Sequence, residues 1–122
     1  MPKRFTAIAV TTITPILLSS TAIAQEIPKT LKQGMDYAQA RKALMNSGWQ
    51  AVELSPNRDR FGAMDYLIQL GYNEVESCSG TGMGFCRLNF TNANGRQLAV
   101  VTVNNQPGQQ PELHRWWIDS EQ

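Results

Sequence analysis

Two cysteines and the glycine-rich segment between them are the residues of this chain best suited to chemistry. Cys78 and Cys86 are its only cysteines, and His114 is its only histidine. A zinc site would need two further ligands, whereas an even cysteine count in an exported chain indicates a disulfide. We therefore expect a Cys78–Cys86 disulfide, no metal site and no cofactor. Closing so short a loop constrains the unfolded chain by roughly 2–3 kcal/mol.

The segment between the cysteines reads Ser-Gly-Thr-Gly-Met-Gly-Phe. Its alternating glycines leave the backbone free of side-chain bulk, so the ring could approach a ligand closely. It lacks the lysine, the serine and the following helix of a phosphate-binding loop. Two alternatives remain, a structural turn between strands and a recognition loop. If the ring binds, Met83 and Phe85 favour contact with a protein or an apolar group.

Residues that could act in catalysis are present without partners that the sequence can place beside them. Histidine is the side chain that most often acts in acid–base catalysis near neutral pH, but no spaced serine or acid accompanies His114, and Ser79 lacks a nucleophile elbow. Glu74 and Glu76 are interpreted as solvent-facing residues of one strand, which does not indicate the paired carboxylates of glycoside hydrolysis. We therefore assign no catalytic residue and expect a protein that is not an enzyme.

The neighbouring tryptophans near the end of the chain are further candidates for binding. Alternation along a strand sends Trp116 and Trp117 to opposite faces, one beneath the helices and one on the open face of the sheet. The sequence does not decide which is exposed. An exposed indole near Phe85 or Tyr72 would form a contact surface for carbohydrate or protein, and packing of both in the core is an equal alternative. The candidate binding residues are thus Met83, Phe85, Trp116 and Trp117.

Hydrophobic spacing predicts the elements that position these residues. Apolar residues three and four apart predict a helix over Tyr37–Ser47, with Asp36 and Gln39 as a capping box, and a second helix over about Arg60–Leu70. Alternation, turn residues and apolar runs predict the strands. The first strand is expected at Trp49–Leu54. Alternation begins at Tyr72 and includes a strand in which Cys86, Leu88 and Phe90 point to one face. The last two strands are expected at Leu98–Val103, after the Asn92–Gly95 turn, and at Leu113–Asp119.

These elements predict an α+β fold. Two helices should pack on one face of an antiparallel sheet of about four strands, with a disulfide-closed loop. The nearly continuous apolar run of Leu98–Val103 favours a central position in the sheet.

The start of the chain has the pattern of an export signal. Lys3 and Arg4 precede an apolar run, and Ala22-Ile23-Ala24 matches the small-x-small pattern of a cleavage site. We expect a signal peptide at residues 1–24, a flexible lead-in at 25–30 and a single α+β domain at 31–122. The mature product should be periplasmic or secreted, without a stable membrane anchor after cleavage.

The charge balance excludes partners chosen by bulk charge. The formal net charge is +1, and loss of the signal peptide with its two basic residues changes it to about −1. The remaining basic residues are scattered and do not form the basic stripe of a nucleic-acid surface. We expect no nucleic-acid partner.

One stretch resembles a known module. Gly34-Met35, Ala40-Arg41, Leu44 and Gly48-Trp49 resemble the opening of PASTA-type modules, in which a glycine turn leads into a helix and a glycine ends it before a strand. The likeness covers about Leu31–Val52, whereas the second helix and the cysteine ring are foreign to that family. It implies binding of cell-wall muropeptides. The whole mature pattern is more similar to small exported bacterial proteins of uncharacterised function, and no activity carries over from them.

Two functions remain as expectations. The first is a non-enzymatic binding module that recognises another protein, of the inhibitor or immunity type, through the disulfide ring and nearby aromatics. The alternative is a cell-wall or glycan-binding protein, possibly a hydrolytic one. A cleft lined by a tryptophan and two carboxylates would favour the alternative.

Overall fold

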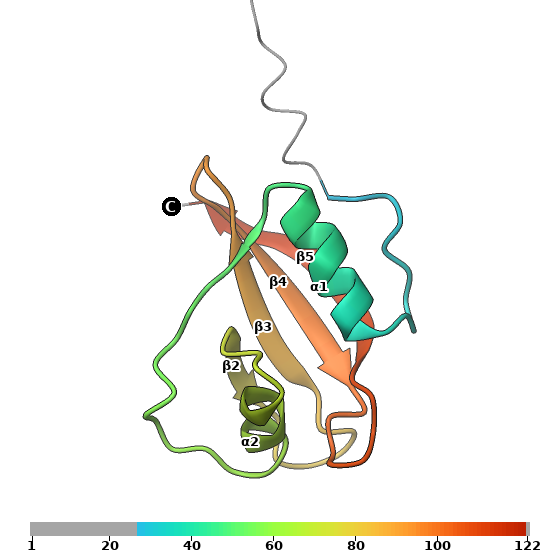
Figure 1. Ribbon diagram of the computed structural model, residues 1–122, viewed down its shortest axis with the longest axis vertical. Helices are drawn as coiled ribbons and strands as arrows, with labels where there is room; N and C mark the ends of the chain where they lie inside the picture. Colours follow the sequence, from blue (N-terminus) through green and yellow to red (C-terminus); the bar gives the residue numbers. More distant parts are fainter. Residues whose placement is uncertain (1–26, 122) are drawn as a thin grey trace, which may run out of the picture.

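The computed structural model describes residues 27–121, with the side chains of 120 and 121 excepted, so the predicted signal peptide lies outside the described residues. It confirms the α+β class (Figure 1). The elements follow one another as α1 (Tyr37–Asn46), β1 (Gln50–Ala51), α2 (Gly62–Gln69), β2 (Val75–Cys78), β3 (Cys86–Thr91), β4 (Arg96–Val103) and β5 (Glu112–Glu121).

The sheet is antiparallel and has five strands in place of the expected four or so. Its main order is β1-β3-β4-β5, and β2 also pairs with β3. β1 pairs with the end of β3 at Phe90 and Thr91, and β2 pairs with its start from Cys86 to Leu88, so the two short strands share one edge. β4 lies between β3 and β5, which confirms the central position expected for Leu98–Val103.

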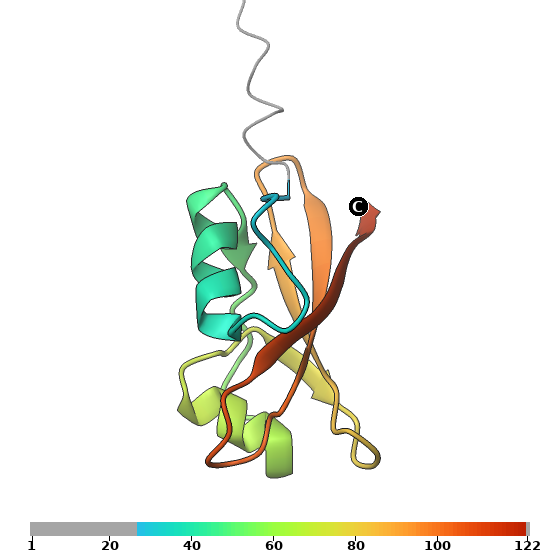
Figure 2. The same cartoon turned by 90° about the vertical axis from the view of Figure 1, so that its right-hand side faces the viewer.

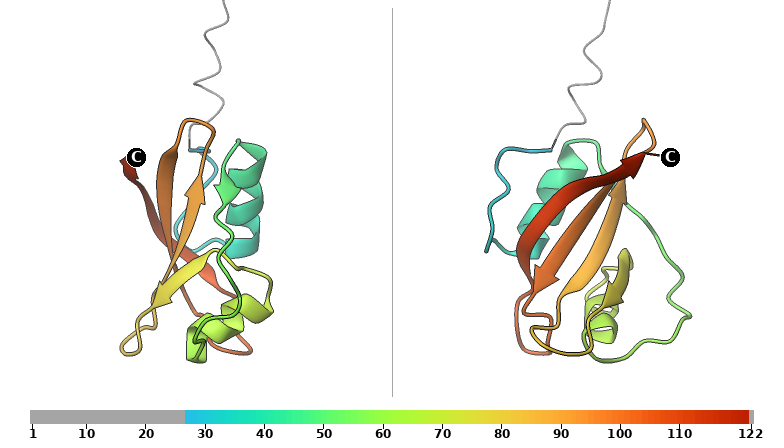
Figure 3. Two further views of the ribbon diagram at one scale, coloured as in Figure 1. Left: turned by 90° about the vertical axis from the view of Figure 1, so that its left-hand side faces the viewer. Right: turned by 180° about the vertical axis from the view of Figure 1, so that it is seen from behind.

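Both helices lie on one side of the sheet (Figure 2). The alternation of β3 turns Cys86, Leu88 and Phe90 toward them, and all three side chains are buried. The opposite face has no helix over it in the part of the chain that the structure describes (Figure 3, right). One hydrophobic cluster therefore fills the space between the helices and the sheet. Its largest members are Trp49, Tyr37, Phe90, Leu44, Leu67, Leu88, Leu98 and Leu113.

The start of α1 differs from the expected capping box. The Asp36 side chain makes no capping hydrogen bond. Asp36 instead forms a backbone bridge to Glu112, and the Tyr37 N–H donates to the Pro111 carbonyl at 2.8 Å. Backbone contacts with the start of β5 thus take the place of a side-chain cap, because the helix terminus lies against another strand.

The first predicted strand, Trp49–Leu54, was too long, because only Gln50 and Ala51 pair with β3. No helix within residues 27–121 has the length and apolar character that a membrane crossing requires.

Candidate functional site

Three segments that are distant in the sequence gather at one end of the molecule. They are α2, the disulfide ring between β2 and β3, and the loop between β4 and β5 (Figure 1). The Tyr66 hydroxyl on α2 donates to the Gln109 carbonyl of that loop at 2.7 Å. The disulfide joins Cys78 and Cys86 as predicted, and these residues lie directly opposite each other in the β2–β3 register. The ring therefore closes a hairpin that the sheet already aligns.

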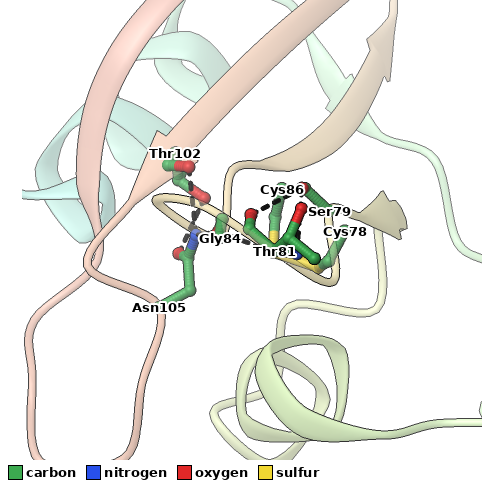
Figure 4. Close-up of a disulfide and its surroundings, with 7 residues drawn as sticks. All are labelled: Cys78, Ser79, Thr81, Gly84, Cys86, Thr102 and Asn105. Atoms are coloured by element: carbon green, nitrogen blue, oxygen red, sulfur yellow. Dashed lines mark hydrogen bonds between the residues drawn. A yellow bond between two sulfur atoms is a disulfide. The ribbon is translucent and has the colours of Figure 1, made fainter.

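The ring is held to the rest of the fold by a buried amide. The Asn105 side chain donates to the Gly84 carbonyl at 2.9 Å and to the Thr102 carbonyl at 3.0 Å (Figure 4). It also accepts a hydrogen bond from the Thr102 hydroxyl at 2.8 Å. Asn105 is 1% exposed, so its polar atoms depend on these partners. The sequence analysis assigned no role to Asn105.

Short contacts within the ring fix its path. The Ser79 N–H donates to the Phe85 carbonyl at 2.7 Å, and the Ser79 hydroxyl donates to the Thr81 carbonyl at 2.8 Å. Gly82 and Gly84 have φ angles of 68° and 66°, which glycine adopts far more readily than other residues. The glycines thus allow the tight path, and the disulfide and Asn105 limit its freedom.

A cleft lies between the ring and the start of α2, with a volume of about 370 Å³. Phe61 stands at this cleft with 75% of its surface exposed. The second helix predicted over about Arg60–Leu70 includes Phe61. In the structure Phe61 precedes α2 in an extended conformation, so its side chain is free of the helix packing. We call this cavity the ring cleft; it is lined by Asp59, Phe61, Gly62, Ala63, Met64, Cys78, Ser79, Gly80 and Gln106.

The two candidate binding residues of the ring lie in different surroundings. Met83 is 64% exposed. Phe85 is half-buried and packs against His114, with the ring centroids 5.0 Å apart. Phe85 and His114, with Val101 and Arg115, line a shallow cavity of about 220 Å³. Met83 is therefore the ring side chain most available to a partner.

The strand register resolves the orientation of the two tryptophans. Trp116 lies opposite Val100 and packs against the hydrophobic cluster on the helix side of the sheet. Trp117 lies opposite Ala99 on the helix-free face. Both are half-buried. Of the two, only Trp117 belongs to the open face of the sheet.

A polar network accompanies Trp117 on that face. Arg87 donates to Asn89 at 3.0 Å and to Asp119 at 2.5 Å, and Asn89 in turn donates to Glu76. The guanidinium carbon of Arg87 lies 5.8 Å from the Trp117 ring centroid, and that of Arg115 lies 5.1 Å from it. Two cations therefore cover part of the indole surface.

The prediction that Glu74 faces solvent is wrong. Glu74 is 1% exposed, and its carboxylate accepts hydrogen bonds from the Tyr37 hydroxyl at 2.6 Å and from Arg41 at 2.6 and 3.1 Å. Arg41 also lies over the Tyr72 ring at 5.2 Å. Strand alternation failed here because Glu74 precedes β2 and its partners come from α1. This cluster joins α1 to the segment before β2.

Burial and the neighbouring charge alter the ionisation of this cluster. Burial, followed by the Glu74 charge, raises the pKa of Tyr37 well above its ordinary value. The hydrogen bond to Glu74 raises the pKa of Arg41. Tyr37 is therefore a neutral donor and Arg41 a cation at physiological pH, so the carboxylate receives three hydrogen bonds and one opposite charge.

We expect Tyr37→Phe to reveal this cluster through the pH dependence of stability. The pKa of Tyr37 is higher in the folded than in the unfolded chain, so its contribution is complete below the ordinary tyrosine pKa and is lost as pH rises above about 10. Tyr37→Phe should lower the free energy of unfolding by about 1.5–3 kcal/mol at neutral pH, because the hydroxyl donates to a charged group. The decline above pH 10 should become shallower.

Urea unfolding of both chains between pH 7 and 11 measures this effect. Tyr66→Phe is the matched control, since its hydroxyl donates to a carbonyl in an exposed hydrogen bond. Identical pH curves for the wild type and Tyr37→Phe would contradict the assignment.

The surroundings of the remaining chemical candidates do not suggest a reaction. His114 contacts Phe85, and the Ser79 hydroxyl donates to a ring carbonyl. In the part of the chain that the structure describes, no three metal-ligating side chains of the His, Cys, Asp or Glu type cluster.

Fold and site together define a small α+β domain that presents a disulfide-closed ring. Comparison of the chain with family models, with curated proteins and with solved structures found no match.

Proposed function

We propose that the chain is an exported, non-enzymatic binding module that recognises another protein, of the inhibitor or immunity type, through the ring cleft and Met83. One observation carries the proposal. Phe61 and Met83 are the most exposed large apolar side chains among the residues described, and both belong to the end of the molecule where the ring is held rigid.

Exposed apolar side chains at one end of a small domain favour a protein partner. Aromatic residues and methionine are enriched in protein interfaces, and a rigid loop loses little conformational entropy on binding. The ring cleft could admit one apolar side chain of the partner, which Phe61 would then cover. The disulfide supports placement in the periplasm or outside the cell, because such bonds persist in oxidising compartments.

We expect Met83→Ala and Phe61→Ala each to weaken binding of the partner at least about tenfold, the size of effect seen at interface hot spots. The partner would first be isolated from periplasmic extract on the immobilised mature chain and identified as a discrete protein. Dissociation constants would then be measured with the purified partner. Both variants should melt like the wild type, because their side chains lie outside the core.

Met45→Ala is the matched control. Met45 is also an exposed methionine, but it lies on α1 beside a different cavity. It should bind the partner like the wild type. If the partner bound Met83→Ala and Phe61→Ala as tightly as Met45→Ala, the ring would be reduced to a structural turn.

A cell-wall glycan is the second candidate, favoured by Trp117 on the helix-free face. The PASTA likeness of Leu31–Val52 implies the same ligand class. Arg87 and Arg115 over the indole reduce the surface on which a sugar could stack. No tryptophan lines the ring cleft, the cavity beside His114 or the cavity beside Met45. Binding to purified peptidoglycan that Trp117→Ala abolishes and Met83→Ala leaves intact would favour this candidate over the first.

A further inference from the structure

The last strand leaves half of its outer edge without a neighbour. On the outer side, the start of β5 is bonded to the segment before α1: the Gly34 N–H donates to the Leu113 carbonyl at 2.7 Å, and the Leu113 N–H donates to the Met35 carbonyl at 2.8 Å. From Arg115 onward, no strand among residues 27–121 lies beside this edge (Figure 3, right). An edge of this kind presents unpaired backbone donors and acceptors.

The strand register identifies which backbone groups face outward. The backbone N–H and C=O of Asn89 on β3 both bond on the side of β1 and β2. In an antiparallel strand the N–H and C=O groups of successive residues point to alternate sides of the strand. The backbone groups of Ala99, which is the register partner of Asn89 on β4, therefore point away from β3 and toward Trp117 on β5. It follows that Trp116 and Ile118 turn their N–H and C=O groups to the free edge.

We propose that this edge binds a second copy of the chain as an antiparallel strand, with the two-fold axis at Trp117. In this register Trp116 faces Ile118 of the second copy, so the outward backbone groups of the two strands meet and pair. Arg115 faces Asp119 of the second copy, and the symmetry produces this contact twice. The interface is self-complementary in backbone bonding, in apolar contact and in charge.

The charges select this register among those that the backbone permits. Sliding the second copy by two residues in either direction also pairs outward-facing groups, but it sets Arg115 or Asp119 opposite Trp117. Both oppositely charged contacts are then lost. Arg115 makes no ion pair with any side chain that the structure describes, and Asp119, which already accepts a hydrogen bond from Arg87, keeps about one-third of its side-chain surface exposed. The guanidinium is therefore available to the carboxylate of a second copy.

Charge reversal with cross-mixing tests the interface. Arg115→Asp and Asp119→Arg each place like charges at both contacts, and we expect each to weaken self-association at least about tenfold. An equimolar mixture of the two variants should restore it, because the Arg115→Asp chain meets the Asp119→Arg chain with opposite charges at both contacts. Sedimentation equilibrium of the mature chain to about 1 mM measures the effect. Met83→Ala should associate like the wild type, which separates this surface from the ring cleft.

Amide hydrogen exchange on the wild-type chain gives a second measurement that needs no variant. The amides of Trp116 and Ile118 should become protected as concentration rises, whereas those of Arg115 and Trp117, which bond to β4, should be protected at every concentration. A wild type that stays monomeric, or an association in which mixing restores nothing and Trp116 and Ile118 stay unprotected, would overturn the proposal.

Discussion

Replacing Arg41 with methionine is expected to lower the free energy of unfolding by about 3 kcal/mol, because it leaves the buried Glu74 carboxylate without its opposite charge. Glu74 is 1% exposed, whereas Arg41 keeps about a quarter of its side-chain surface in water. Partial access to water sets the expected cost at the lower end of the range for buried pairs. Urea unfolding at pH 7 measures it.

A second substitution separates loss of charge pairing from loss of packing. Arg41→Met combined with Glu74→Gln removes the unpaired charge but keeps an oxygen that accepts the Tyr37 hydroxyl. We expect this double variant to recover about 1–2 kcal/mol relative to Arg41→Met. Lys42→Met is the surface control on the same helix and should change stability by no more than about 0.5 kcal/mol. A double variant no more stable than the single one would refute the charge-based explanation.

Phe90→Ala is expected to cost about 3–5 kcal/mol through the cavity it leaves beneath the helices. Phe90 is fully buried in β3, between the register partners Ala51 and Leu98. Phe61→Ala removes the same side chain from an exposed site and should leave stability within about 0.5 kcal/mol. Thermal and urea unfolding of both variants measure the difference.

The two phenylalanines thus separate scaffold from surface. Phe90→Ala acts on stability, and Phe61→Ala acts on binding of the partner. Equal losses of stability in the two variants would show that Phe61 belongs to the core and would remove it from the proposed binding surface.

Local patterns in the sequence predicted most of the fold. The alternation of Cys86, Leu88 and Phe90 identified the buried face of β3, and the Asn92–Gly95 turn identified the β3–β4 hairpin. These features depend on neighbouring residues, whose spacing is set by the geometry of a strand or a turn. The disulfide was predicted from the even cysteine count together with the export signal.

The errors arose where contacts between distant segments decide the outcome. Glu74 is buried because Tyr37 and Arg41, from a helix more than thirty residues earlier, supply its hydrogen bonds. Asp36 does not cap its helix because that terminus lies against β5. The sequence left the orientation of Trp116 and Trp117 undecided, because it depends on their register with β4, which shifts before Arg115. Patterns along one segment do not contain these pairings.

The attachment of the ring implies that its sequence is separable from the fold. The cysteines face each other across paired strands, and the contact of Asn105 with the ring uses the backbone carbonyl of Gly84 rather than a side chain. Positions 80, 81 and 83 can therefore vary, while Gly82 keeps its positive φ and the Ser79 hydroxyl keeps its bond to the Thr81 carbonyl. For the proposed binding role, this arrangement would suit a loop-exchange scaffold, in which three ring positions are diversified and the sheet stays unchanged.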